Sequence, residues 1–317
     1  MLSIIRILQI VKAKVMRRRL ALSDISDVDG IVSAALYKRK YRDSIVVLAS
    51  PVDVGRSLII KSTKWDFVSD LPCPGRVEVR ADHHITNRPC ARREFYDPKA
   101  PCAALLALRA LGLRDDISKD LVKIAIETDT ASIESTEADL LNLAVKGAGY
   151  HGKLYLVEKL AEIGLEVLKD ERVRKYIERA RIVKKATEYM ASRIEIMPIT
   201  VVVFYRDLKL LYRYLSILLE KKGAKFTCII VPKGIMKVRV YLGARQDSIY
   251  DSSILAKSLG GGGHRYAAGA TITSFRTRRC TRDILRKLMY YTGVDELVIQ
   301  EVHDIHTIKR RTITVLS

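Results

Sequence analysis

The sequence has few cysteines, no long apolar run and a shortage of acidic side chains. None of its five cysteines belongs to a C-x-x-C pair, which argues against a zinc knuckle. Their odd number and scattered positions fit a reducing cytosol better than a disulfide framework, so we expect a cytoplasmic protein. No apolar stretch approaches the roughly 20 residues that a membrane-spanning helix needs. The five cysteines are Cys73, Cys90, Cys102, Cys228 and Cys280.

The charge of the chain is strongly positive. It has 56 Lys and Arg residues against 36 Asp and Glu residues, which gives a formal net charge of +20. Such an excess favours a polyanionic partner such as nucleic acid, although a basic protein without such a partner is the alternative. In the N-terminal stretch MLSIIRILQIVKAKVMRRRL the charges follow the apolar run, which is the reverse of a signal peptide, so we expect a basic amphipathic helix.

A length of 317 residues exceeds what one compact core usually holds, so we expect two domains. From residue 18 short apolar runs alternate with helical patterns, which is typical of an α/β domain with a parallel sheet covered on both faces. A charged helical stretch follows, and then a second, smaller α/β region with a basic tail. The predicted parts are a catalytic domain with a basic N-terminal helix at 1–154, a helical connector at 155–196 and a substrate-binding domain at 197–317.

Acidic residues and histidines stand at the ends of several apolar runs in the first α/β region. The stretch LSDISDVDGIVSAA contains Asp24, Asp27 and Asp29. Taken alone this pattern is a weak signal, because aspartate is also a common helix N-cap. Three further runs end in similar groups: WDFVSD in Asp70, VEVRADHH in Asp82, His83 and His84, and IAIETDT in Glu127, Asp129 and Thr130.

These run ends predict a metal site. If the sheet is parallel, its strand ends converge at one edge. Carboxylates with some imidazole suit Mn²⁺ or Mg²⁺. More carboxylates than one ion needs indicate two ions, roughly 3.5–4 Å apart, which activate water at a phosphorus centre.

A glycine-rich segment, SLGGGGHRYAAGATI, predicts a phosphate cradle in the second region. Consecutive glycines let the backbone approach a ligand and turn its N–H groups toward an anion. His264 can donate to a phosphate, and Arg265 or Arg245 can neutralise it. A flexible linker is disfavoured because the segment lies between a helical pattern and an apolar strand pattern.

The sequence resembles a known family at these places. The strings SDVDGIVSAA, DLP, ADHHITN and ETDTAS resemble, in order and spacing, the four motifs of the DHH phosphoesterase family. GARQDSIYDSSILAKSLGGGGHRYAAGATI resembles the core of the DHH-associated C-terminal domain, and the resemblance covers about residues 20–275. The family includes RecJ-like exonucleases, oligoribonucleases that also act on small phosphorylated nucleotides, cyclic-dinucleotide phosphodiesterases and polyphosphatases.

The resemblance implies roles for individual residues. The aspartate that corresponds to Asp70 bridges both metals, His84 polarises the scissile phosphate or its water, and Asp82 orients a neighbouring histidine. The implied metal ligands are Asp27, Asp29, Asp70, His83 and Asp129. The implied phosphate-holding residues, across the cleft between the domains, are Arg245, Gly261, Gly262, Gly263 and His264.

One position departs from the family pattern. Many members carry a histidine or aspartate where this chain has Ile25, which is unable to bind metal. Asp24 is one residue away and is expected to face the other side of the strand. We therefore expect one ion to accept a water in place of a protein ligand and to bind more weakly.

The expected function is that of a Mn²⁺-dependent phosphodiesterase, with Mg²⁺ as the alternative ion. It would release mononucleotides from single-stranded or short oligonucleotides by two-metal water activation. Two alternatives stay open: a non-catalytic scaffold partnered by replication or repair proteins, and a phosphatase of small phosphorylated nucleotides. The sequence leaves open DNA or RNA, the direction of digestion, the preferred substrate length and the oligomeric state.

Overall fold

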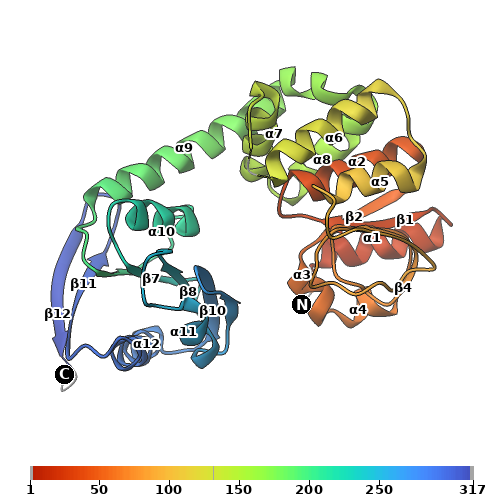
Figure 1. The fold of residues 1–317 in the computed structure, drawn as a ribbon. Helices are drawn as coiled ribbons and strands as arrows, with labels where there is room; N and C mark the ends of the chain where they lie inside the picture. The colour runs from red at the N-terminus through yellow and green to blue at the C-terminus, as the bar shows by residue number, and fades with distance from the viewer. Residues whose placement is uncertain (1–2, 131, 315–317) are drawn as a thin grey trace. The chain divides into compact units, whose positions relative to one another are not determined.

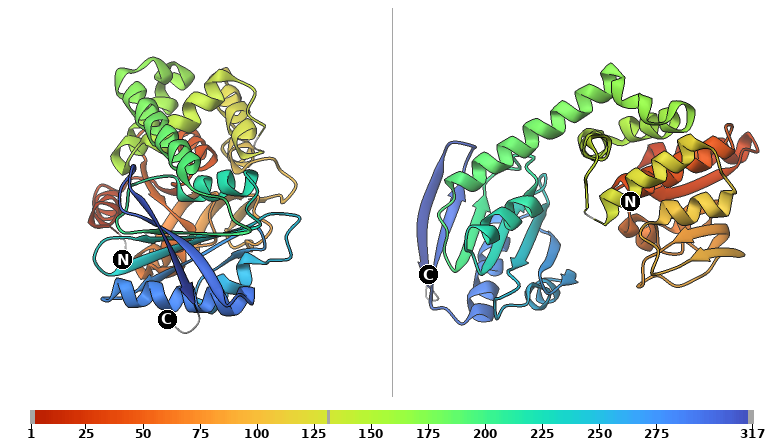
Figure 2. Two further views of the ribbon diagram at one scale, coloured as in Figure 1. Left: turned by 90° about the vertical axis from the view of Figure 1, so that its left-hand side faces the viewer. Right: turned by 45° about the horizontal axis from the view of Figure 1, so that its top comes forward.

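The computed structural model describes residues 3–130 and 132–314. The chain forms two compact units, Met1–Arg181 and Ile182–Ser317. Each unit contains one β-sheet with helices on both faces (Figures 1 and 2). Among the described residues, we find no helix that combines the length and the apolar character needed to cross a bilayer. Two predicted segments reach beyond the described residues, at Ala131 and at 315–317.

The first unit is built on a parallel sheet of five strands in the order β2-β1-β3-β4-β5. Successive side chains of a strand point to opposite faces of the sheet. In β1 the side chains on both faces are apolar: Leu20 and Leu22 belong to one core cluster and Ala21 to another. Both faces therefore need a helical cover, as predicted. The strands are β1 (Leu20–Asp24), β2 (Ile45–Ala49), β3 (Lys64–Ser69), β4 (Arg76–Asp82) and β5 (Arg93–Tyr96).

The helices of the first unit cover the two faces of its sheet unequally (Figure 1). One face carries three helices, α1 (Ile4–Val15), α3 (Pro51–Arg56) and α4 (Leu58–Ser62). The larger core on the other face packs under α2 (Val28–Lys40), α5 (Ala103–Leu111), α6 (Asp116–Asp129), α7 (Thr136–Gly147) and α8 (Tyr150–Ile163). The chain continues through η1 (Gly164–Lys169) into α9 (Glu171–Arg193), within which one unit ends and the next begins.

The second unit has a mixed sheet of seven strands in the order β12-β11-β6-β7-β8-β10-β9. Its parallel part is β11-β6-β7, and the remaining neighbours are antiparallel. The sequence pattern did not predict β11, whose acidic and amide residues interrupt its apolar run. The strands are β6 (Ile199–Phe204), β7 (Phe226–Pro232), β8 (Lys237–Ala244), β9 (Gly262–His264), β10 (Ala267–Thr273), β11 (Glu296–Val302) and β12 (Ile308–Thr314). The helices are α10 (Tyr212–Lys221), α11 (Ser252–Ser258) and α12 (Thr277–Thr292).

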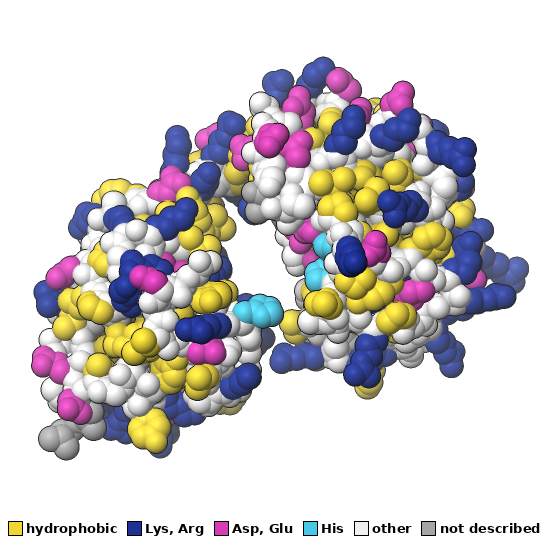
Figure 3. Space-filling view, viewed as in Figure 1, with side chains coloured by type: hydrophobic (Ala, Val, Ile, Leu, Met, Phe, Trp, Pro, Cys, Tyr) yellow, Lys and Arg dark blue, Asp and Glu magenta, His cyan; other side chains and the backbone are white. Residues whose placement is uncertain are grey.

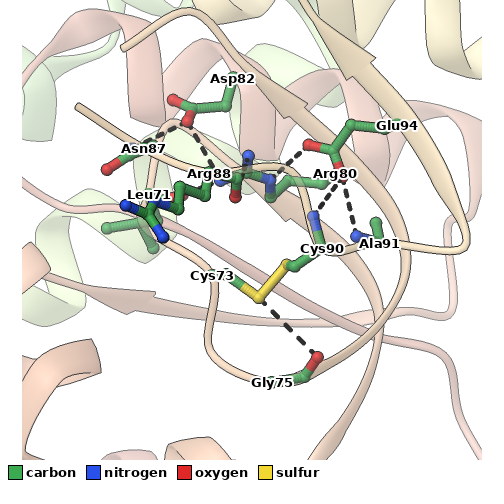
Figure 4. The surroundings of a disulfide bond; sticks show 10 residues. All are labelled: Leu71, Cys73, Gly75, Arg80, Asp82, Asn87, Arg88, Cys90, Ala91 and Glu94. Carbon is green, nitrogen blue, oxygen red and sulfur yellow. Dashed lines mark hydrogen bonds and ion pairs between the residues drawn. A yellow bond between two sulfur atoms is a disulfide. The ribbon is translucent and has the colours of Figure 1, made fainter. Parts of the chain in front are cut away.

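A disulfide bond joins Cys73 to Cys90, whose Cα atoms lie 6.0 Å apart (Figure 4). The expectation that the cysteines form no disulfide is therefore wrong for this pair. The two cysteines are 17 residues apart, but they lie in the loops that leave the neighbouring strands β3 and β4 at the same sheet edge. Strand pairing thus brings them together, which cysteine spacing alone did not indicate. The other three, Cys102, Cys228 and Cys280, are buried free thiols.

Candidate metal centre

Two aspartates of the β1–α2 turn serve the fold as well as the candidate site. Asp27 caps α2, because its carboxylate accepts a hydrogen bond from the Gly30 backbone N–H at 3.2 Å. A side chain at Gly30 would clash with the carbonyl group of Asp24, so the tight turn requires glycine here. The helix-capping interpretation of this motif is therefore correct, and it does not exclude a ligand role, because a capping carboxylate keeps further lone pairs free.

Asp29 is held by a second helix. Its two carboxylate oxygens accept hydrogen bonds from the backbone N–H groups of Ala103 and Ala104, both at 2.7 Å, at the start of α5. The N-terminus of a helix favours a negative charge. Burial nevertheless raises the pKa of Asp29 to about 8. The carboxylate is thus fixed in position but is costly to ionise without a nearby cation.

Asp70 follows β3 in a left-handed backbone conformation, with φ at +57°. Its N–H donates to the Ala81 carbonyl of the neighbouring strand at 3.0 Å, which holds this conformation. Aspartate tolerates positive φ better than most residues, and such positions often mark functional constraints. Burial, and then the nearby Asp29, Asp27 and Asp24 carboxylates, raise the pKa of Asp70 well above its ordinary value.

The two histidines after β4 have different surroundings. His83 Nδ1 lies 3.1 Å from the Ala100 carbonyl oxygen, which leaves Nε2 directed at carboxylates: it is 3.4 Å from Asp129, 3.8 Å from Asp29 and 3.9 Å from Asp70. A backbone contact on one ring nitrogen with the other nitrogen facing acids is the arrangement of metal-binding histidines. The ring is only 15% exposed. His83 thus has the position of an inner ligand.

His84 is oriented by Asp82, and its side chain is 50% exposed. Its Nδ1 lies 3.0 Å from Asp82 Oδ1 and 3.4 Å from Asp70 Oδ1. The hydrogen bond to Asp82 raises the pKa of His84, so the ring carries a positive charge over a wider pH range. A half-exposed imidazole beside the acids can contact a bound phosphate.

Asp82 is the most enclosed carboxylate of this part of the site, and the residues around it were not identified from the sequence. It is fully buried, and it accepts hydrogen bonds from Arg80 at 3.1 Å and Asn87 at 2.8 Å. Arg80 is itself fully buried and pairs with Glu94 at 2.6 Å (Figure 4). In the sequence, the available sign of this network was Arg80, an arginine within a predicted strand that lies in the interior of the sheet.

The structure brings all the predicted ligands into three overlapping groups. Within each group the possible ligand atoms lie within 4.8 Å of one another: Asp24, Asp27 and Asp70; Asp29, His83 and Asp129; and Asp70, His83 and His84. Figure 3 shows histidine side chains next to acidic ones at the surface of the first unit. Two other residues at the predicted run ends do not belong to these groups. Glu127 accepts hydrogen bonds from the backbone N–H groups of Glu134 and Ser135. The Thr130 hydroxyl donates to the Ile126 carbonyl.

The residues present fit a divalent cation. The donors are carboxylate oxygens and imidazole nitrogens, which suit Mn²⁺ or Mg²⁺. Burial and mutual repulsion raise the pKa values of Asp24, Asp29 and Asp70 in the absence of an ion. Such crowding is relieved when a cation lies between the oxygens.

The expectation that Asp24 faces away from the site is wrong. Its carboxylate accepts hydrogen bonds from the Ile25 N–H at 2.7 Å and the Ser26 hydroxyl at 3.2 Å, so it folds over the turn that follows β1 and joins Asp27 and Asp70. The prediction assumed that side chains continue to alternate between the two faces of the sheet, but β1 ends at Asp24 and the alternation ends with it. Lys153 of α8 adds a positive charge here: its ammonium donates to the Ile25 carbonyl at 2.5 Å and attracts Asp24.

The glycine segment of the second unit follows α11 and forms the edge strand β9. A Cβ at Gly261 would clash with the backbone of β10 at Gly269, and one at Gly263 would clash with it at Ala267. Gly262 has open space around it, and His264 is exposed. Strand packing therefore requires glycine at Gly261 and Gly263, whereas Gly262 is not constrained by packing.

Arg245 directly follows β8, at the end of that strand where Gly243 pairs with Ala267 of β10. Its guanidinium makes a bidentate ion pair with Asp247, with nitrogen–oxygen distances of 2.5 and 2.7 Å. Lys225 also contacts Asp247, at 2.8 Å. A phosphate bound by Arg245 would have to compete with this exposed carboxylate, and the predicted role of Arg245 stays a prediction.

Folding without metal should become less favourable as the pH rises. An unfolded aspartate titrates at about 4, whereas Asp29 keeps its proton to about 8, so between these values the folded state binds more protons. Stability then falls with rising pH. In EDTA, urea denaturation should give an unfolding free energy at least about 2 kcal/mol lower at pH 8 than at pH 5. Asp70→Asn should reduce this dependence of the unfolding free energy on pH. Asp43→Asn, at an exposed position, is the control and should leave the dependence unchanged. Equal pH dependences in the two variants would contradict the prediction.

The position of Asp24 predicts a contribution to metal binding. Asp24→Ala should raise the Mn²⁺ concentration for half-saturation at least about tenfold, because one carboxylate contact is worth more than 1.4 kcal/mol in a buried site. Isothermal titration calorimetry measures this without turnover. Asp43→Ala, which removes an exposed acid of the same unit, is the control. Equal Mn²⁺ affinities of the two variants would exclude Asp24 as a ligand.

The sequence matches no protein-family model and no curated protein. Solved structures are similar in fold. PggH, a pGpG-specific phosphodiesterase from Vibrio cholerae, has a TM-score of 0.61 at 18% identity, over 86% of this chain and 99% of that one. Exonuclease RecJ bound to manganese gives 0.55 at 15% identity, over 92% and 95% of the two chains. The DHH domain of a member of the s1p family of ribosomal proteins gives 0.54 at 14% identity, over 90% and 91%.

These three similarities each extend over most of both chains, and they confirm at the level of the fold the resemblance that the sequence motifs predicted. The parallel sheet of the first unit and the mixed sheet of the second agree with the predicted α/β class. The chain therefore has the fold of the DHH-domain proteins.

Proposed function

We propose that the chain is a metal-dependent phosphodiesterase of the DHH phosphoesterase family that hydrolyses short or single-stranded oligonucleotides to mononucleotides. The observation that carries the proposal is the convergence of three ligand groups at the ends of β1, β3 and β4. The buried acids Asp24, Asp29 and Asp70 have raised pKa values, and the ion-pair contacts of Asp29 and Asp70 are to the imidazoles of His83 and His84. This arrangement is costly for folding, which supports a functional reason for it.

The proposed cofactor is a pair of Mn²⁺ ions, with Mg²⁺ as the alternative. Asp70 and His83 each belong to two of the three ligand groups. Asp70 is the one suited to contact both ions, because a carboxylate offers two oxygens. When bound, such a pair supplies an activated water and stabilises the oxygens of the phosphate. The proposed protein ligands are Asp27, Asp29, Asp70, His83 and Asp129, with Asp24 added from the structure.

The second histidine has a different proposed role. The hydrogen bond to Asp82 raises the pKa of His84 and so favours its protonated form, and half of its side chain faces solvent. It can thus donate to a phosphate oxygen and offset charge there. Asp82 positions the ring, and Arg80 and Asn87 in turn fix Asp82. His83→Ala should therefore mainly weaken metal binding, and His84→Ala should mainly slow turnover.

The similar structures support nucleotide phosphodiesters as the substrate class, because their names describe a pGpG phosphodiesterase and an exonuclease. Similarity to PggH specifically favours a dinucleotide phosphodiesterase as the second candidate. Both candidates use the same metal centre, and they differ in the length of the substrate. The site as described gives no specific support to a non-catalytic scaffold, since its predicted ligands all join the metal-type groups.

Removal of one carboxylate at Asp70 should abolish turnover. We expect purified protein with Mn²⁺ to release mononucleotides, and Asp70→Asn to lose at least about a thousandfold in rate, because both ions depend on this side chain. The substrates are pGpG and labelled single strands of several lengths, in DNA and RNA, followed by chromatography. Asp43→Asn is the control. A wild-type protein that binds Mn²⁺ by calorimetry yet cleaves none of these substrates would refute the proposal.

Gly262 offers a test of the phosphate cradle that leaves the fold intact. Gly262→Val should raise KM at least about tenfold, since the side chain would occupy the space in which a phosphate approaches the backbone. Mn²⁺ affinity and thermal stability should stay at wild-type values, because nothing lies within 4 Å of that Cβ position. Gly55→Val, at another uncrowded glycine, is the control. An unchanged KM would remove the segment from substrate binding.

A further inference from the structure

A row of exposed arginines lies on α12 in the second unit. Arg278, Arg282 and Arg286 are four residues apart, so they share one side of the helix and follow each other at roughly 6 Å. Lys and Arg side chains are visible along the lower border of this unit, near the place where Figure 1 labels α12 (Figure 3). The row is close in spacing to the phosphates of an extended nucleic-acid strand.

These arginines are not used by the fold. None of the three forms an ion pair with an acidic side chain in the described ranges 3–130 and 132–314, in contrast to Arg310, which contacts Glu195 at 3.2 Å. The opposite side of α12 is buried in the core through Cys280, Ile284 and Leu288. The packing of the helix therefore depends on its apolar side, and its basic side is free for a ligand.

The arginine row forms one wall of a groove of about 560 Å³. Arg311 of β12 adds a fourth guanidinium, and its contact with Glu301 is long, at 3.9 Å. Tyr205 also lines the groove; it is 46% exposed and stacks on His303 with ring centroids 4.2 Å apart. The groove thus combines a basic wall with an aromatic platform.

A second aromatic ring extends this surface. Phe275 precedes α12 and is 81% exposed. It lines a shallow depression together with Arg278, Arg282 and Arg286. A large apolar ring is seldom left this open unless it contacts a partner.

We propose that the groove between α12 and β12 is a binding site for single-stranded polynucleotide. The arginine row would contact consecutive phosphates, and Tyr205 and Phe275 would stack on bases, which is the combination used for single strands regardless of sequence. The site is formed by the second unit alone. It does not rest on the proposed phosphodiesterase activity, because binding can be measured without metal and without turnover.

An anionic membrane is the competing partner for a basic helix. A membrane-surface helix inserts an apolar face into the lipid. The apolar face of α12 is occupied by the core, and its basic side faces a groove with an aromatic wall. These features favour a strand that fits between two elements over a flat lipid surface.

The test compares two charge-matched triple variants by fluorescence anisotropy in EDTA. Arg278→Gln/Arg282→Gln/Arg286→Gln removes the row, and Lys184→Gln/Lys185→Gln/Lys221→Gln removes three exposed charges elsewhere on the same unit. The probes are labelled DNA and RNA strands of about 20 nucleotides. The arginine variant should bind at least about tenfold more weakly, and its log–log salt slope should be smaller by about 2, as expected for three lost phosphate contacts.

The lysine variant should bind almost as wild type, and Tyr205→Ala should weaken binding at least about fivefold, as expected for one lost base stack. Equal losses in both triple variants would show a general charge effect and overturn the proposal, as would wild-type binding by the arginine variant. Binding to vesicles of phosphatidylcholine and phosphatidylserine tests the alternative that the surface binds a membrane. Binding to vesicles that depends on the arginine row, without such dependence for the strands, would assign the surface to membranes instead.

Discussion

The parallel pairing of β1, β3 and β4 is the constraint on which the candidate site depends. These strands are neighbours in the sheet, so their carboxyl ends meet at one edge, and each end carries acids or histidines. Bringing several carboxylates together in a buried place is unfavourable. The fold supports this arrangement through local devices: the start of α5 binds Asp29, and the Ala81 carbonyl holds the left-handed backbone of Asp70.

A second layer of interactions determines where the exposed histidine points. Arg80 is fully buried and contacts Asp82, Glu94 and the carbonyl groups of Leu71 and Arg88. It therefore ties the loops after β3 and β4, which the disulfide also joins, to the carboxylate that orients His84 (Figure 4). Removal of one member of a buried ion pair leaves an uncompensated charge, so the geometry of the site depends on residues outside the three ligand groups.

The two anion-binding features proposed for the second unit lie at opposite edges of one sheet. The glycine segment forms β9 at one edge, and the arginine groove lies against β12 at the other. The first is built from backbone with little side-chain bulk, which suits close contact with a phosphate group. The second is built from long cationic side chains and aromatic rings, which suit a flexible strand. In these proposals, one small sheet carries two different kinds of anion-binding surface.

The sequence by itself determined the α/β class and pointed to most of the proposed ligands, because apolar periodicity and strand-end acids are local signals. Asp27, Asp70 and His83 could be predicted because each lies near the end of an apolar run, within a string that resembles a DHH-family motif. Tertiary structure decided what local patterns do not contain: the Cys73–Cys90 bond, the inward turn of Asp24, and the approach of Lys153 from 128 residues away. These contacts arise from strand pairing, turn hydrogen bonds and helix packing, which act between residues distant in the chain or after a strand's alternation has ended.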